Sequence, residues 1–165
     1  MGLSAGRLSD FSGQIMMGLQ NLRDRMFNLK SQKDFLETSL EVFNYQYYNN
    51  AIYQDFIKSL GKDPSKINTL YELPYLPVEF FKNHEIISGS FPVEMIFESS
   101  GTTGVNPGRH FVNDLSLYQE SFIESFRLFY GEPEDYLITA LLPAYAEREG
   151  SSLVYMVDNL IKRSH

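Results

Sequence analysis

A run of small and hydroxylated residues, Ser99 to Gly104, lies between two segments of different character. The segment before it, 91–97, is rich in β-prone residues, and the apolar spacing after about residue 115 is helical. Glycines let a backbone adopt positive φ and approach a ligand closely, and hydroxyls beside backbone N–H groups suit phosphate. The order of strand, glycine-rich loop and helix therefore predicts an α/β fold with an anion-binding loop.

Arg109 follows this run and can add a planar cationic fork to the loop. The chain lacks the G-x-x-x-x-G-K-S/T pattern of a Walker A loop, which argues against an ordinary P-loop phosphotransferase. A simple surface turn of small residues remains the alternative to a phosphate site.

The N-terminal half reads as helical. Apolar residues recur every three or four positions over 15–29, 35–47 and 52–60, which predicts three helices with one apolar face each. Ser31 is expected to cap the second helix, and Asn49-Asn50 to end it. Gly61 should end the third helix. Core packing explains these three stripes without a cofactor.

The next stretch, 70–82, contains Pro74 and Pro77 and is expected to be extended, with a short helical turn at 78–82. After the loop, Asp114 or Ser116 should cap a helix that Gly131 ends.

Residues 136–142 are almost wholly apolar and read as a strand buried on both faces. A last helix should begin near Ser151 or Ser152 and cover 153–161. This alternation predicts a mostly parallel sheet with flanking helices. The loops after Phe97 and Leu142 would then meet in one crevice at the edge of the sheet.

Three parts follow from this reading. Residues 1–13 form a flexible leader, 14–90 a helical N-terminal segment, and 91–165 the beginning of an α/β nucleotide-binding lobe.

Composition excludes several classes of protein. The net charge of −7 argues against a nucleic-acid-binding surface. The absence of cysteine excludes disulfides, thiolate metal sites and a cysteine nucleophile within the chain. The three histidines lack metal-ligand spacing, so no metal site is expected from protein side chains. No apolar run is long enough for a membrane span and no secretory signal is present, so we expect a cytoplasmic location.

The run from Ser99 to Gly104, followed by Pro107 and Arg109, resembles the phosphate loop of the AMP-forming acyl- and aryl-adenylate synthetases, S-S-G-T-T-G-x-P-K. The chain departs from that pattern at its end. Asn106 is an extra residue before the proline, Gly108 follows it, and arginine stands where lysine is usual.

Neighbouring stretches extend this resemblance. Residues 45–53, 60–61, 73–82 and 141–158 look like the acyl-protein synthetases of bacterial luminescence, and more loosely like phenylacetate–coenzyme A ligases. The similarity covers roughly residues 26–163 and corresponds to the first half of such an enzyme. We therefore expect a fragment, the incomplete N-terminal lobe of an adenylate-forming enzyme.

The resemblance implies that ATP, with Mg²⁺, activates a fatty or aryl carboxylic acid as an acyl-adenylate. A thiol, on a protein or on coenzyme A, then takes the acyl group. The resemblance assigns the β- and γ-phosphates to the hydroxyls of Thr102 and Thr103 and to the backbone from Gly101 to Gly104. Ser99 and Ser100 would shape the loop, and Arg109 would offset phosphate charge.

The same resemblance places Tyr145, Gly150 and Ser151 beside the acyl or nucleotide pocket. The alternative is that residues 147–149 form a solvated charged loop. No catalytic acid, base or nucleophile can be named, so the chain alone should be inactive. A non-catalytic nucleotide-binding or protein-interaction module that keeps the loop is the competing reading.

Overall fold

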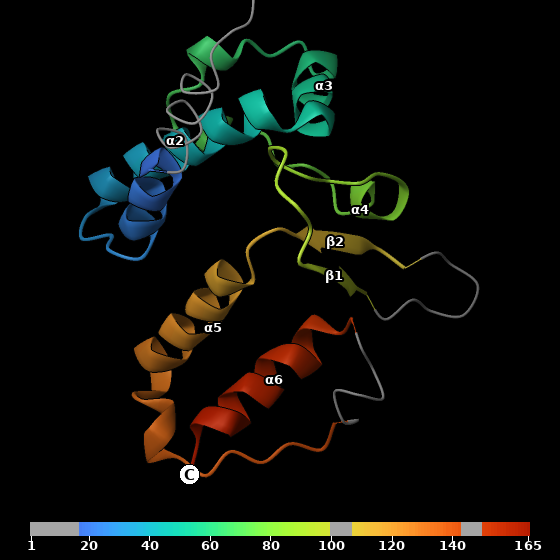
Figure 1. Cartoon of the computed structure of the whole chain (residues 1–165). Coiled ribbons are helices and arrows are strands. Elements are labelled where there is room, and N and C mark those ends of the chain that lie inside the picture. The colour runs from blue at the N-terminus through green and yellow to red at the C-terminus, as the bar shows by residue number, and fades with distance from the viewer. Residues whose placement is uncertain (1–16, 100–106, 143–149) are drawn as a thin grey trace, which may run out of the picture.

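Helices dominate the structure, and a small two-stranded sheet lies between two groups of them (Figure 1). The computed structural model describes residues 17–99, 107–142 and 150–165. The expected leader, 1–13, lies outside these residues. None of the described helices combines the length and the apolar character needed to cross a bilayer.

The first group of helices precedes residue 90. It contains a helix over 17–26, then α2 (Gln32–Asn49), α3 (Ala51–Ser59) and the short α4 (Phe80–Asn83). Two 3₁₀ turns, η1 (Pro64–Lys66) and η2 (Leu70–Glu72), lie between α3 and α4. The three predicted helices and the predicted short turn are thus present, with ends shifted by a few residues.

Polar caps set the ends of α2 and α3. The Ser31 hydroxyl accepts a hydrogen bond from the Asp34 backbone N–H at 3.1 Å, as predicted. Asn50 ends α2 and also caps α3, because its side-chain oxygen accepts from the Tyr53 N–H at 3.0 Å. Asn50 is buried, so this double role fixes the angle between the two helices.

Aromatic rings fill the contact between α2 and α3. The ring of Phe43 is buried and lies 6.1 Å from the ring of Tyr53, edge to face. The Tyr53 hydroxyl donates to the Pro74 carbonyl at 2.6 Å, and burial raises the pKa of Tyr53 to about 12. The tyrosine thereby ties the extended proline segment to the helices.

The sheet is a hairpin rather than the parallel sheet expected from the sequence. Strand β1 (Met95–Glu98) pairs antiparallel with β2 (Arg109–Val112), and Glu98 stands opposite Arg109. Antiparallel neighbours need only a short connection, whereas parallel neighbours need a crossover. Because β2 follows β1 after ten residues, the described part of the chain is α-rich with a small antiparallel sheet.

Helices α5 (Leu115–Tyr130) and α6 (Ser152–Arg163) form the second group and pack together near the sheet (Figure 1). The buried ring of Phe97 in β1 lies 5.2 Å from the ring of Tyr118 and 5.6 Å from that of Tyr155. Phe122, Ile123 and Leu160 form the core between the two helices. Phe97 therefore anchors the hairpin to α5 and α6.

The ends of α5 and α6 follow the sequence signals. Asp114 caps α5, and its carboxylate accepts from the N–H groups of Ser116 and Leu117. Gly131, at φ 89°, ends that helix, and η3 (Pro133–Asp135) follows. Ser151 caps α6 through a 3.3 Å hydrogen bond from the Val154 N–H.

The prediction of a buried strand over 136–142 is wrong for this structure. The segment forms no strand, and Leu137 and Leu141 are almost fully exposed. Its first part is instead bound to the end of α6, where the His165 N–H donates to the Tyr136 carbonyl at 3.1 Å. Apolar composition favours burial, but a strand also needs a neighbour, and β1 and β2 pair with each other.

Candidate functional site

The two ends of the predicted phosphate loop lie side by side at the tip of the hairpin. The Ser99 N–H donates to the Gly108 carbonyl at 2.9 Å, and the Gly108 N–H donates to the Ser99 hydroxyl at 2.8 Å. The loop is therefore closed at its base by two hydrogen bonds. Five predicted ligands lie outside the described residues: Ser100, Gly101, Thr102, Thr103 and Gly104.

Arg109 begins β2 directly after this closure. Its guanidinium lies 5.3 Å from the ring centre of Phe111 and 4.0 Å from the carboxylate of Glu85. The side chain is nearly half exposed. The long ion pair and the ring contact hold the guanidinium at the loop base while leaving it accessible to an anion.

Helix α4 also packs beside Gly108 at the loop base. A Cβ at Gly108 would lie 3.8 Å from the Cβ of Phe81 and 3.7 Å from the Cγ of Lys82. Phe81 also packs edge to face on His110 of β2, with ring centres 5.8 Å apart. The sequence predicted a helical turn here but gave no role to Lys82, which the fold brings to the loop base.

His110 is partly exposed, and the burial of its imidazole beside Phe81 lowers its pKa below the usual value. The neutral form therefore dominates at pH 7, and His110 adds no positive charge to the hairpin. Among the described residues, the charged side chains near the loop base include Lys82 and Arg109, with Glu85 and Glu98 as neighbouring carboxylates.

The second predicted loop reaches the first at its C-terminal end. The Gly150 carbonyl accepts a hydrogen bond from the Glu98 N–H at 2.8 Å, one residue before Ser99. Gly150 has φ 88°, and a Cβ there would lie 3.5 Å from the Ile96 carbonyl oxygen. The structure therefore places Gly150 beside the base of the first loop. The sequence predicted that the two loops meet at the edge of a parallel sheet, whereas this contact is made at the edge of an antiparallel hairpin.

The structure gives different results for the other two predicted pocket residues, Ser151 and Tyr145. The Ser151 hydroxyl is occupied as the cap of α6. Tyr145 lies outside the described residues. In the part of the chain that the structure describes, no group of three or more histidine, aspartate or glutamate side chains is placed to hold a metal ion.

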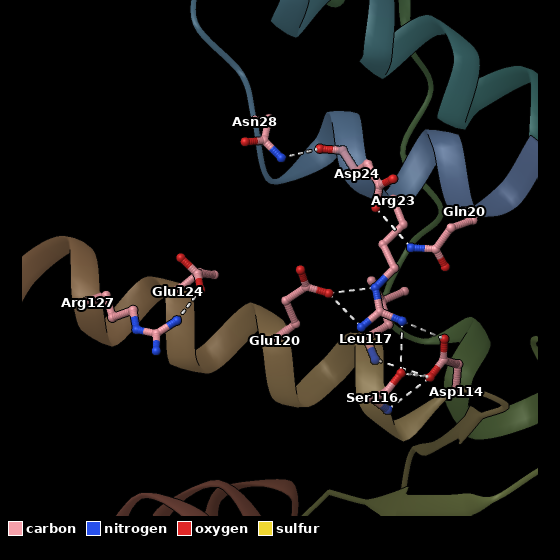
Figure 2. A network of polar contacts seen from close by, with 10 residues as sticks. All are labelled: Gln20, Arg23, Asp24, Asn28, Asp114, Ser116, Leu117, Glu120, Glu124 and Arg127. Carbon is pink, nitrogen blue, oxygen red and sulfur yellow. Dashed lines mark hydrogen bonds and ion pairs between the residues drawn. The ribbon is translucent and has the colours of Figure 1, made fainter. Parts of the chain in front are cut away.

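A second polar cluster lies away from the loop, around Arg23 (Figure 2). The Arg23 guanidinium contacts the Glu120 carboxylate at 2.6 Å, the Ser116 hydroxyl at 2.8 Å and the Asp114 carboxylate at 3.2 Å. The helix over 17–26 is thereby bound to the first turns of α5. Since its partners surround the guanidinium, we interpret this cluster as structural and not as a binding site.

Opposing effects act on the pKa of Asp114 in this cluster. Burial alone would raise its pKa, but hydrogen bonds from Ser116 and Leu117 and the charge of Arg23 outweigh it. The pKa of Asp114 therefore lies below its ordinary value, and the carboxylate is ionised at neutral pH. The sequence predicted Asp114 or Ser116 as the cap of α5 but gave no sign of the distant partner Arg23.

Comparisons with protein-family models, curated proteins and solved structures found no match for this chain. The resemblance to adenylate-forming ligases is therefore a prediction from the motif residues of the sequence.

Proposed function

We propose that this chain supplies the phosphate-binding loop of an AMP-forming ligase that activates a carboxylic acid with ATP. The observation that carries the proposal is the base of the loop. Ser99 and Gly108 close a segment rich in glycine and hydroxyls, and Arg109 stands next to that closure. Backbone N–H groups, hydroxyls and a guanidinium are the donors that bind phosphate oxygens most effectively.

In the proposed reaction, a carboxylate oxygen attacks the α-phosphorus of ATP and the bond to pyrophosphate breaks. The products are an acyl-adenylate and pyrophosphate, and a thiol of a protein or of coenzyme A then displaces AMP. Mg²⁺ would be held chiefly by the phosphates, which is usual for this ion. ATP is abundant in the cytoplasm, where we place the reaction.

The contribution of this chain is positioning and charge stabilisation. Thr102 and Thr103 would donate to the phosphates, and Arg109 would offset charge that shifts toward the leaving pyrophosphate. Ser99 has a more limited part, because its hydroxyl already accepts from the Gly108 N–H. Gly150 would couple the second loop to this site through Glu98.

The proposal is tested by carboxylate-dependent ATP–pyrophosphate exchange, run on this chain and on the longest natural reading frame that contains it, together with binding of MgATP. We expect Thr103→Val to reduce both binding and exchange at least tenfold, because one charge-assisted hydrogen bond is lost. Thr103→Ser keeps the hydroxyl and should stay within about threefold of the wild type. Equal values for the two variants would contradict the role of the loop, and no binding of MgATP by either length of wild-type protein would refute the proposal.

A non-catalytic interaction module is the second candidate, and one observation favours it. Apolar side chains are strongly exposed at the end of α5 and in the segment after it: Leu128, Phe129, Leu137 and Leu141. Exposed apolar groups of this kind are typical of surfaces that another protein segment covers. MgATP binding without exchange by the longer reading frame would favour this candidate over the ligase.

A further inference from the structure

Segment 136–142 has the composition and the alternating exposure of a strand with one buried face. Its residues, Tyr-Leu-Ile-Thr-Ala-Leu-Leu, include no charged residue, proline or glycine. Tyr136 has extended backbone angles, and Ile138 packs against the core between α5 and α6. Leu137 is 79% exposed and Leu141 is fully exposed. The odd-numbered leucines therefore face away from the helices, as alternate residues of an extended chain do.

The backbone of this segment lacks most of the hydrogen bonds that a strand makes. The Tyr136 carbonyl accepts from the His165 N–H at 3.1 Å, and the Ile138 N–H donates to the Ser164 hydroxyl at 3.4 Å. Within the described part of the chain, the N–H and C=O groups of 139–142 have no hydrogen-bond partner. An extended apolar segment with free backbone groups is a template for pairing with another strand.

The segment also lacks the features that usually protect such an edge. Proteins block exposed strand edges with charged side chains, prolines or bulges. Here Pro133 and Pro143 lie outside the segment, one before it and one after it. The prolines therefore limit the length of a paired strand, and they leave 136–142 itself open to pairing.

A second copy of the same segment complements the first in antiparallel orientation. In a two-fold symmetric strand pair each residue lies opposite one that points to the same face. Pairing centred on Thr139 uses all seven residues and places Leu137 of each copy opposite Leu141 of the other. The two most exposed leucines of the segment then cover each other across the strands.

Charge favours the antiparallel orientation over the parallel one. Glu134 and Asp135 directly precede the segment. A parallel pair in register would place these carboxylates beside the same carboxylates of the other copy, which is destabilising. An antiparallel pair places them at opposite ends. The net charge of −7 per chain still repels the second copy, so salt should strengthen the association.

We propose that this chain forms a two-fold dimer in which segment 136–142 pairs antiparallel with the same segment of a second copy. The inference goes beyond the proposed nucleotide function and does not depend on it. The free backbone groups of 139–142 supply the hydrogen bonds of the strand pair, and Leu137 and Leu141 supply its apolar contacts. Because two short strands form a small interface, we expect reversible association with a Kd on the order of 10 μM.

The test is sedimentation velocity over about a hundredfold range of protein concentration around that Kd, with circular dichroism to verify folding. Leu137→Lys and Leu141→Glu should each weaken dimerisation at least about tenfold, because a charge then lies opposite a leucine. An equimolar mixture of the two variants should associate within about threefold of the wild type, because the introduced ammonium and carboxylate face each other. Leu128→Lys is the matched control on α5, since Leu128 is also 79% exposed, and it should stay within about twofold of the wild type.

Deuterium exchange adds a readout of the backbone. Exchange in 136–142 should slow as the protein concentration rises through the Kd, because the strand pair protects alternate amides. A wild type that stays monomeric over the whole range refutes the proposal. So does a dimer in which exchange of this segment is unchanged, or one that Leu128→Lys weakens as much as Leu137→Lys. A mixture of the two charged variants that associates no better than either alone refutes the antiparallel register.

Discussion

Replacing Arg23 by methionine should release the first helix from α5. Methionine keeps much of the apolar stem but removes the guanidinium that contacts Glu120, Ser116 and Asp114 (Figure 2). Asp114 would keep its hydrogen bonds from the start of α5, so the cap should survive. The expected effect is a loss of attachment of the helix over 17–26 rather than a loss of α5.

The magnitude follows from the exposure of the partners. Hydrogen bonds to charged groups contribute about 1.5–3 kcal/mol when buried, and exposed ion pairs about 0.2–1 kcal/mol. The Arg23 side chain is 20% exposed and that of Glu120 35% exposed, which lies between these limits. We therefore expect a loss of about 2 kcal/mol in the free energy of unfolding, or roughly 4–8 °C in melting temperature for a chain of this length.

Urea unfolding followed by circular dichroism at 222 nm measures this loss. The control is Arg25→Met on the same helix, since Arg25 pairs with Glu41 at the surface and both side chains are about half exposed. That variant should lose no more than about 1 kcal/mol. A double-mutant cycle with Glu120→Gln should give a coupling of at least about 1 kcal/mol. Equal losses for Arg23→Met and Arg25→Met, or no coupling to Glu120, would refute the attachment.

Two further predictions concern the hairpin. Gly150→Ala should lower the free energy of unfolding by about 1–2 kcal/mol, because alanine is strained at φ 88°. The control Gly18→Ala should not lower it, because a Cβ at Gly18 meets open space and the residue lies in a helix. Equal losses for the two variants would contradict this reasoning. His110 has a lowered pKa, so the unfolded chain binds more protons and stability should rise with pH up to about 6.5. His110→Asn should flatten that rise in pH-dependent melting curves, and a slope unaffected by His110→Asn would contradict the assignment.

Local signals predicted the helices well. Apolar spacing located α2, α3, α5 and α6. The cap of α2 was predicted as Ser31, and the caps of α5 and α6 were each predicted as one of two residues, Asp114 or Ser116 and Ser151 or Ser152. These signals work because helix hydrogen bonds and caps join residues within four positions of each other. The sequence therefore contained what was needed for these elements.

Pairing between strands was predicted poorly, because it depends on the neighbour. The segment Arg109–Val112 begins with two polar residues and was not predicted as a strand, yet it pairs with β1. Residues 136–142 have the stronger strand composition and form none. Strand propensity describes how well a residue fits beside others, so composition alone favoured the wrong segment.

The candidate site, like the fold, was predicted only in part from the sequence. The sequence pattern grouped Ser99 and Arg109 in one predicted anion-binding loop, and their neighbours Gly108 and Glu98 lie at its base in the structure. The meeting with Gly150 was expected from a parallel sheet, which the described residues do not form. It gave no role to Lys82 and no sign of the contact between Arg23 and α5. Both depend on tertiary packing across segments distant in sequence, and no local pattern reports that.

The hydrogen bond from the Glu98 N–H to the Gly150 carbonyl makes one amide a shared reporter for both loops. On its other edge β1 pairs with β2, so this amide proton exchanges with solvent only when Gly150 moves away from the strand. A ligand that binds at either loop and stabilises the hydrogen bond between Glu98 and Gly150 will slow the exchange of the Glu98 amide proton. A single deuterium-exchange signal at Glu98 can thus follow events at two places along the chain that are some fifty residues apart.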